Sequence, residues 1–251
     1  MMPPFRRARK VRRRALVTGG AIRVGRAIAL ALARAGFDVA IGYHRSAAAA
    51  NRTVRELEAL GARAVALRVN LAAAGAPRRL VDRAARRLGG LDVLVNNAAG
   101  FTRTPLATTT ERQYARLLDL NLKAAYFTTQ AAARWMRAGG HVVSVGDAAA
   151  LSPDPGWVPY GLSKAGLVAL TRGLAAELAP RRIAVNCVAP GPVLKPDRLP
   201  LARWRAIRRG RAGDVDEVAA AVVVFVTCPP RVTGRVQIVG RRRRSPERSA
   251  C

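Results

Sequence analysis

A tyrosine and a lysine four residues apart form the most chemically suggestive pair in the sequence. Tyr160 and Lys164 lie in the segment YGLSK, and Asp147 precedes the tyrosine by 13 residues. A free phenol has a pKa of about 10 and exchanges protons poorly near neutral pH. A lysine one helical turn away faces the same side of a helix, and its positive charge lowers the pKa of the phenol. The spacing of Tyr160 and Lys164 therefore predicts a phenol prepared for proton transfer, and the role of the Asp147 carboxylate is open at this point.

Short apolar runs alternate with longer helical patterns along nearly the whole chain. The predicted strands are Arg14–Thr18, Val39–Tyr43, Ala64–Val69, Leu91–Asn96, His141–Val145, Ile183–Val188 and Val236–Val239. The predicted helices are Val24–Ala35, Ala47–Leu60, Pro77–Leu88, Glu111–Arg137 (one long helix or two abutting ones), Tyr160–Leu178 and Asp214–Val226, the last with Asp214 as N-cap. This alternation predicts an α/β fold: a single-domain Rossmann-type, doubly wound parallel sheet with helices on both faces. Ligands of such sheets lie at the carboxyl ends of the strands.

The loop after the first predicted strand is rich in glycine. It reads TGGAIRVG over Thr18–Gly25 and opens a helix. Backbone N–H groups at a helix N-terminus bind a dinucleotide pyrophosphate, and glycines permit the close approach. The candidate cofactor-binding residues here are Thr18, Gly19, Arg23, Val24 and Gly25. A plain strand–helix turn is the alternative interpretation.

The end of the second predicted strand bears on the choice of cofactor. NAD sites usually carry Asp or Glu there, to bind the ribose hydroxyls. Residues 43–51 read YHRSAAAAN, and no acid follows until Glu56. His44, Arg45 and Ser46 can donate hydrogen bonds to a 2′-phosphate instead. The segment favours NADPH, although an Arg-rich chain could also place a solvated basic loop here.

Taken together, the motifs resemble those of the short-chain dehydrogenase/reductases. The resemblance rests on TGGAIRVG, NNAAG at 96–100, Asn121 in NLKAAYF, Tyr160-x-x-x-Lys164 and APG at 189–191, in order from about residue 14 to 240. Asp147 stands where classical members have serine, and Arg23 where they have glycine. With YHRSAAAAN and NNAAGFTRTPL, these departures are most similar to the pteridine reductases, NADPH enzymes that reduce pterins to tetrahydropterins.

The resemblance implies a role for each matching residue. Tyr160 donates the proton, Lys164 lowers the pKa of Tyr160 and holds the nicotinamide ribose, and Asn121 supports a water-linked proton relay. Asp147 pairs with Tyr160 and contacts a substrate ring on which Phe101 stacks, while Arg23 faces phosphate or substrate. Asn70, Asn97, Ala98, Pro190 and Gly191 complete the expected cofactor site. Asn70 replaces an aspartate common in the family, and Ala99 replaces a polar residue common in pteridine reductases. No pattern of residues predicts a metal site.

Three functions remain open at this point. The first is an NADPH-dependent pterin reductase, and the second is a general NADPH-dependent carbonyl or 3-oxoacyl-thioester reductase. The third is a catalytically weak polyanion-binding protein on the same fold, since the chain carries a net charge of +29. However, 40 of its 44 basic residues are arginine, as a coding bias would produce, and aromatic residues that could stack on bases are few (5%). Nucleic acid is therefore not the expected partner.

The composition also bears on organisation and location. We expect a basic N-terminal arm at 1–11, one reductase domain at 12–240 and a basic C-terminal tail at 241–251. The longest apolar runs, such as Val218–Val226, are too short to span a bilayer. Three scattered cysteines fit a reducing, cytoplasmic setting. The resemblance implies a homotetramer or homodimer, although the four arginines at 241–244 would repel one another across a two-fold axis.

Overall fold

The structure is a computed structural model that describes residues 12–148, 150, 154–193, 195, 201–208 and 213–240. The expected arm at 1–11 and the expected tail at 241–251 lie outside the described residues.

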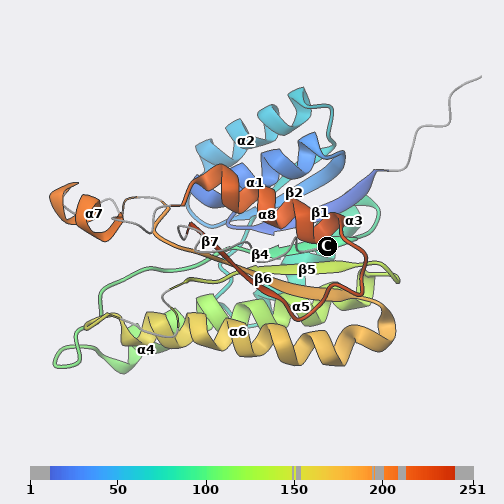
Figure 1. The fold of residues 1–251 in the computed structure, drawn as a ribbon. Coiled ribbons are helices and arrows are strands. Elements are labelled where there is room, and N and C mark those ends of the chain that lie inside the picture. Colours follow the sequence, from blue (N-terminus) through green and yellow to red (C-terminus); the bar gives the residue numbers. More distant parts are fainter. Residues whose placement is uncertain are drawn as a thin grey trace, which may run out of the picture.

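Seven parallel strands form one sheet in the order β3-β2-β1-β4-β5-β6-β7 (Figure 1). The strands are β1 (Arg13–Thr18), β2 (Phe37–Tyr43), β3 (Ala64–Arg68), β4 (Val93–Asn96), β5 (His141–Val145), β6 (Ala184–Pro190) and β7 (Val236–Val239). The predicted fold class is confirmed, and each predicted strand is present with its bounds shifted by two residues at most. The order of the strands reverses between β1 and β4, which creates a crevice at their carboxyl ends.

Helices cover both faces of the sheet. They are α1 (Arg23–Arg34), α2 (Ala47–Ala59), α3 (Ala76–Leu88), α4 (Glu111–Leu118), α5 (Ala124–Trp135), α6 (Val158–Leu178), α7 (Leu201–Arg208) and α8 (Val215–Thr227). Helices α1, α2 and α8 pack on one face, and α3, α5 and α6 pack on the other (Figure 1). Successive strand residues point to opposite faces, so Ala15 and Val17 enter the first core while Leu16 enters the second.

The predicted segment Glu111–Arg137 forms two abutting helices, α4 and α5, one of the two alternatives expected, and a π-helical turn at Asp119–Lys123 joins them. Helix α7 was not predicted, because its arginine-rich sequence has no clear apolar stripe. The predicted N-cap of α8 is confirmed, since Asp214 and Glu217 form a reciprocal capping box.

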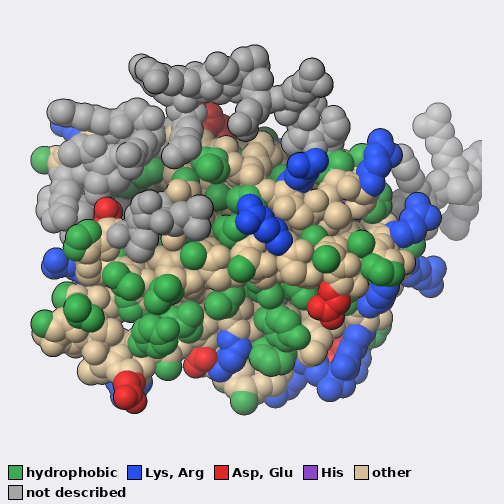
Figure 2. Space-filling model, turned by 60° about the horizontal axis from the view of Figure 1, so that its bottom comes forward, with side chains coloured by type: hydrophobic (Ala, Val, Ile, Leu, Met, Phe, Trp, Pro, Cys, Tyr) green, Lys and Arg blue, Asp and Glu red, His purple; other side chains and the backbone are tan. Residues whose placement is uncertain are grey.

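The face formed by α4, α5 and α6 exposes apolar side chains (Figure 2). The large exposed residues on α5 and α6 are Tyr126, Phe127, Trp135, Val158 and Leu162. Large exposed apolar side chains gathered on neighbouring helices are typical of a surface that contacts another protein.

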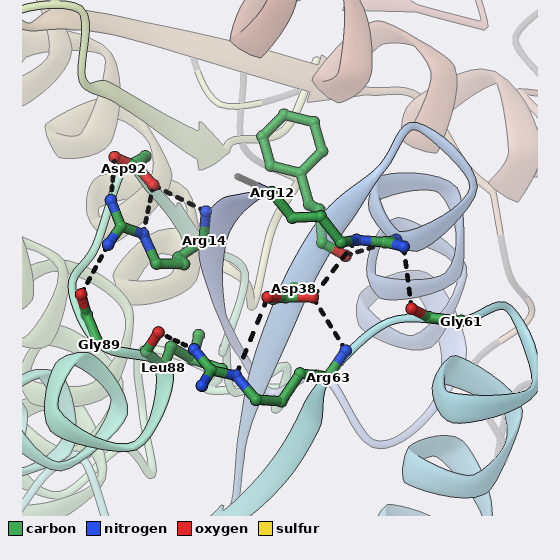
Figure 3. A network of polar contacts seen from close by, with 9 residues as sticks. Arg12, Arg14, Asp38, Gly61, Arg63, Leu88, Gly89 and Asp92 are labelled. Atoms are coloured by element: carbon green, nitrogen blue, oxygen red, sulfur yellow. Dashed lines mark hydrogen bonds and ion pairs between the residues drawn. The ribbon is translucent and has the colours of Figure 1, made fainter. Parts of the chain in front are cut away.

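Arginines and aspartates connect the amino ends of the strands (Figure 3). Asp92 binds the backbone N–H and the guanidinium of Arg14, at 2.8 Å each. Asp38 forms ion pairs with Arg12, at 3.3 Å, and with Arg63, at 3.9 Å. This edge of the sheet is therefore fastened by charged pairs that are partly shielded from water.

Two of these arginines, and the neighbouring Arg13, also donate hydrogen bonds to carbonyls near the C-termini of helices. Arg12 donates to Gly61, which follows α2, and Arg63 donates to Leu88 at the end of α3. Arg13 donates to Val226 near the end of α8 at 2.7 Å. Carbonyls at helix ends carry partial negative charge and lack partners within the helix. Part of the excess of arginine is thus explained by structure rather than by an external polyanion.

His141 gives the stability of the fold a pH dependence. The ring is 2% exposed, and its Nδ1 has no hydrogen-bond partner among the described residues. Burial first, and then the charge of Arg13, lower the pKa of His141 from 6.5 to about 4. The unfolded chain therefore binds this proton more readily than the folded one, and stability is lost as the pH falls from 6.5 towards 4.

We expect His141→Gln to remove this loss. The free energy of unfolding of the wild type should fall by about 3 kcal/mol more than that of the variant between pH 7 and pH 4. Urea unfolding at both pH values measures the difference, and titration of the shared carboxylates cancels between the two proteins. Equal pH dependence in both proteins would contradict the assignment.

None of the helices in the described part of the chain combines the length and the apolar character that a membrane crossing requires. The described residues also hold no group of three or more His, Cys, Asp or Glu side chains placed to bind a metal ion.

Candidate active site

The crevice between β1 and β4 is built by side chains that tie the two strand ends together. The Thr18 hydroxyl accepts hydrogen bonds from the backbone N–H groups of Asn97, at 2.9 Å, and Ala98, at 3.0 Å. The Asn97 amide donates to the carbonyls of Thr18, at 2.9 Å, and Gly19, at 3.2 Å. Thr18, Asn97 and Ala98 thus form the floor of the crevice, so these predicted cofactor residues lie together.

The glycine-rich loop needs its glycines for two separate reasons. Gly19 has φ +65°, a left-handed conformation that side chains rarely adopt. Gly25 is packed so tightly that a Cβ atom there would lie 2.1 Å from the Gly19 carbonyl oxygen and 2.5 Å from Asn97 Nδ2. The loop delivers the first N–H groups of α1 to the crevice, where a pyrophosphate would be stabilised.

Arg23, the first residue of α1, also has a positive φ, of +55°. A non-glycine residue in this conformation is strained by about 1–3 kcal/mol, which is typical of functional positions. Its guanidinium donates to the Lys195 carbonyl at 3.3 Å. Arg23 therefore links the glycine-rich loop to the segment that follows β6, across the mouth of the crevice.

The end of β2 presents polar donors to the same edge of the sheet. His44 and Arg45 are exposed, and Ser46 precedes α2 without a side-chain capping bond. Asn70 follows β3 and accepts the N–H of Ala72 at 3.3 Å, so this side chain closes its own turn. Proteins of this fold that bind NAD usually carry an acid at this position, which binds the ribose hydroxyls. The polar donors found here suit a negatively charged group instead.

Tyr160 donates a hydrogen bond to Asp147 Oδ2 at 2.7 Å. Asp147 follows β5 and Tyr160 lies in the first turn of α6, so the sheet and the helix together fix this pair. Burial, and then the charge of Asp147, raise the pKa of Tyr160 well above 10. The expectation that Lys164, together with the charge of the nicotinamide, lowers this pKa stays a prediction, since the main causes of the shift seen here are burial and Asp147. The phenol stays protonated at neutral pH.

Lys164 is buried behind Tyr160. Its Nζ donates to the Val145 carbonyl at 2.8 Å and lies 5.9 Å from the centre of the Tyr160 ring. Burial lowers the pKa of Lys164, partly opposed by the charge of Asp147. A small cavity adjoins this side chain, with polar lining from Thr18, Asn96, Asn121, Thr128 and Lys164. Val145 was not identified from sequence, since a backbone acceptor leaves no sequence signal.

Asn121 fastens the loop that follows β4. Its side chain accepts the N–H of Gly100 at 2.7 Å and donates to the Gly100 carbonyl at 3.0 Å. The second amide hydrogen goes to Ser163 Oγ at 3.0 Å, and Ser163 in turn donates to the Tyr160 carbonyl at 2.7 Å. The structure thus gives Asn121 a positioning role, whereas its part in a proton relay stays a prediction. Ser163 was not identified from sequence, although it stands three residues after Tyr160.

Two aromatic rings, of Phe101 and Trp157, lie beside the phenol of Tyr160. Phe101 stacks on Trp157 with ring centres 4.1 Å apart and an angle of 15° between the rings. Its ring also makes an edge contact with Tyr160, at 4.8 Å and 83°. Phe101 lies where the resemblance places a substrate-stacking ring, and Trp157 was missed. The position of Trp157, three residues before Tyr160, was the available signal.

The end of β6 closes the far side of the site. Pro190 accepts the N–H of Ala148 at 2.9 Å, and Gly191 donates to the carbonyl of Val239 at 2.8 Å. The candidate residues therefore lie in loops and helix starts at the carboxyl edge of the sheet, on the helix that follows β5 or, in the case of Asn121, in the π-helical turn between α4 and α5. The arrangement can hold an extended dinucleotide across the crevice, with a protonated phenol at one end.

Comparisons with known proteins agree with this geometry. The profile of the short chain dehydrogenase family matches residues 13–203. A 3-oxoacyl-[acyl-carrier-protein] reductase of Synechocystis is 34% identical, covering 86% of this chain and 89% of the relative. A hydroxynaphthalene reductase-like protein of Metarhizium brunneum is 33% identical, covering 90% and 85%. The crystal structure of a short chain dehydrogenase from Burkholderia cenocepacia J2315 in complex with NADP has a TM-score of 0.86 at 41% identity, covering 92% and 97%.

Proposed function

The chain belongs to the short-chain dehydrogenase family of NAD(P)-dependent oxidoreductases, and we propose that it is an NADPH-dependent reductase of carbonyl compounds. The observation that carries the proposal is a buried, protonated Tyr160 at the edge of the sheet that also holds the glycine-rich loop. One relative supports a carbonyl substrate, since it is named as a 3-oxoacyl-[acyl-carrier-protein] reductase.

The residues of the crevice fit a bound dinucleotide. A Cβ at Gly25 would clash with the Gly19 carbonyl oxygen and Asn97 Nδ2, so glycine keeps the loop compact at the start of α1, whose first N–H groups would hold the pyrophosphate. Thr18, Asn97 and Ala98 define the floor, and His44, Arg45 and Ser46 would receive the adenosine end. When bound, NADPH supplies the hydride and therefore both electrons of the reduction.

The chain itself supplies position and a proton. Tyr160 donates its proton to the carbonyl oxygen as that oxygen gains negative charge. A phenol keeps its proton at neutral pH, so Tyr160 is in the protonation state that a donor needs. Asp147 is only partly buried and accepts the Tyr160 hydrogen bond, so it connects the phenol to solvent for reprotonation. Lys164 places a positive charge behind the ring and stabilises the phenolate that forms as the proton leaves.

A pterin is a second candidate substrate, and the Asp147 carboxylate favours it. The carboxylate lies 2.7 Å from the phenol oxygen. A carboxylate can accept hydrogen bonds from the ring N–H and amino groups of a pterin, which a serine would do less well. Phe101 offers an aromatic surface beside the same pair. None of the relatives described above is named for a pterin, so carbonyl reduction is our main proposal.

Parallel assays separate the two substrates. Oxidation of NADPH is followed by absorbance with an acetoacetyl thioester, dihydrobiopterin and dihydrofolate, using wild type and Asp147→Ser. Turnover of the thioester by both proteins supports carbonyl reduction. Turnover of a pterin that collapses in Asp147→Ser supports the second candidate and overturns the first. If NADPH is not oxidised with any of the three substrates, both candidate functions are contradicted.

Arg45 is expected to decide the preference for NADPH. A charged hydrogen bond contributes about 1.5–3 kcal/mol, and Arg45 is exposed, so we take the lower end of this range. Arg45→Ala should raise KM for NADPH about tenfold and leave KM for NADH nearly unchanged. Arg87→Ala, an exposed arginine in the last turn of α3, is the matched control. Equal effects on both cofactors would show that Arg45 does not contact the 2′-phosphate.

We also propose that the protein forms a homodimer or homotetramer through α4, α5 and α6. Support comes from the apolar side chains exposed on this face (Figure 2). Phe127, on α5, is a large exposed member of the patch. Size-exclusion chromatography with light scattering should give at least twice the 26.8 kDa of one chain, and Phe127→Glu should shift the mass towards one chain. A wild type of one-chain mass would contradict the proposal.

A further inference from the structure

The first turn of α6 has few stabilising bonds of its own, although it carries the proton donor. Tyr160 is the third residue of the helix, and the N-cap residue Trp157 makes no side-chain capping bond. Pro159, the second residue, has no backbone N–H to contribute. The start of a helix without a cap is poorly anchored, because its first N–H groups have no partner within the helix. The position of Tyr160 therefore depends on contacts with other elements.

Ser163 makes one of these contacts from the interior of the protein. Its side chain is fully buried, and its hydroxyl donates to the Tyr160 carbonyl at 2.7 Å. The same oxygen accepts an amide hydrogen of Asn121 at 3.0 Å. The other polar atoms of the Asn121 side chain bind the N–H and the carbonyl of Gly100. A chain of hydrogen bonds thus runs from the loop after β4, through Asn121 and Ser163, to the backbone of Tyr160.

Close packing of the π-helical turn against α6 brings the two ends of this chain together. A Cβ at Gly166 would lie 2.7 Å from Leu122 Cδ2, so the absence of a side chain at this position allows the approach. Gly166 follows Ser163 by about one helical turn, and Leu122 follows Asn121 directly. The fold therefore holds Asn121 within hydrogen-bonding reach of Ser163.

We infer that Ser163 is a positioning residue for the proton transfer, which fixes the turn of Tyr160 to the loop after β4 through Asn121. This inference rests on the proposed function and deepens it by assigning a role to a further residue. Removal of the hydroxyl would leave a buried amide hydrogen of Asn121 without a partner, at a cost of about 1–3 kcal/mol. Asn121 and the first turn of α6 would then rearrange, and general acid catalysis is sensitive to small displacements of the donor.

The test is a double-mutant cycle on the complete enzyme. Ser163→Ala should lower kcat for carbonyl reduction about tenfold and leave KM for NADPH within about twofold of wild type. In the Tyr160→Phe background, the same substitution should change the residual kcat by less than about twofold, because the group that Ser163 positions is already absent. A role in general stability alone would instead give the same fractional loss in both backgrounds.

Thr171→Val is the matched control. Thr171 is a second buried residue of α6, and its hydroxyl donates to the Leu167 carbonyl at 2.7 Å. This variant should keep kcat within about twofold of wild type. A wild-type kcat in Ser163→Ala, equal losses with and without the phenol oxygen, or the same loss in Thr171→Val would each overturn the inference and leave the reductase function standing. A wild type that reduces no carbonyl compound would instead contradict the function on which the inference rests.

Discussion

Tyr160→Phe should lower kcat for carbonyl reduction roughly 10³-fold while the affinity for NADPH stays close to that of wild type. The substitution removes one oxygen atom and keeps the ring that contacts Phe101. The lost atom is the donor in the hydrogen bond to Asp147 and, in our account, the source of the proton. A water molecule replacing it would lack the fixed position on which general acid catalysis depends.

Steady-state kinetics at saturating NADPH, together with NADPH binding followed by fluorescence, measures both quantities. Tyr114→Phe is the matched control, because Tyr114 is exposed on α4 and makes no part of the site. A Tyr160→Phe enzyme that retains more than a tenth of the wild-type kcat would show that another group donates the proton.

Gly25→Ala should abolish tight NADPH binding. The new Cβ would lie 2.1 Å from the Gly19 carbonyl oxygen, a backbone atom that cannot move without displacing the loop. Overpacking of this severity costs about 1–3 kcal/mol of stability, and displacement of the loop removes the backbone N–H groups that would hold the pyrophosphate. We expect the Kd for NADPH to rise at least about 100-fold, because the charged hydrogen bonds of the loop would be lost together.

Gly173→Ala is the matched control for this prediction. Gly173 is exposed in the interior of α6, and a Cβ there meets nothing within 4 Å. Alanine is the better helix former, so this variant should be more stable by about 0.5–1 kcal/mol and bind NADPH normally. Calorimetric titration and thermal unfolding of both variants check the pair. Normal NADPH affinity in Gly25→Ala would place the pyrophosphate elsewhere.

Much of the fold followed from local signals in the sequence. Glycines after the first three predicted helices (Gly36, Gly61 and Gly89) and the apolar runs between helices located the seven strands, because a buried parallel strand reads as a continuous apolar run. Asp214 was predicted as an N-cap, since aspartate followed three residues later by glutamate is a helix-start pattern. Helix α7 was missed because its sequence, LARWRAIR, lacks a stripe of apolar residues.

The site was predicted less completely, because its finer properties depend on contacts distant in sequence. The resemblance to the pteridine reductases predicted that Asp147 pairs with Tyr160, and the structure brings their oxygens to 2.7 Å. The direction of the Tyr160 pKa shift could not be read from spacing, since it depends on burial that only the packed fold defines. The stacking of Phe101 on Trp157 joins two loops 56 residues apart, and the clamp of Asn121 on Gly100 spans 21 residues.

Transfer of deuterium tests the central claim most directly. The wild-type enzyme is given NADPH carrying deuterium at both C4 positions, together with a carbonyl substrate that it reduces, and the alcohol is analysed by mass spectrometry and NMR. Our account predicts one deuterium on the carbinol carbon of each product molecule. The hydroxyl hydrogen of the product should carry no label, because it comes from solvent through Tyr160. Alcohol without deuterium, or oxidation of NADPH without formation of any alcohol, would contradict the assignment of this protein as an NADPH-dependent carbonyl reductase.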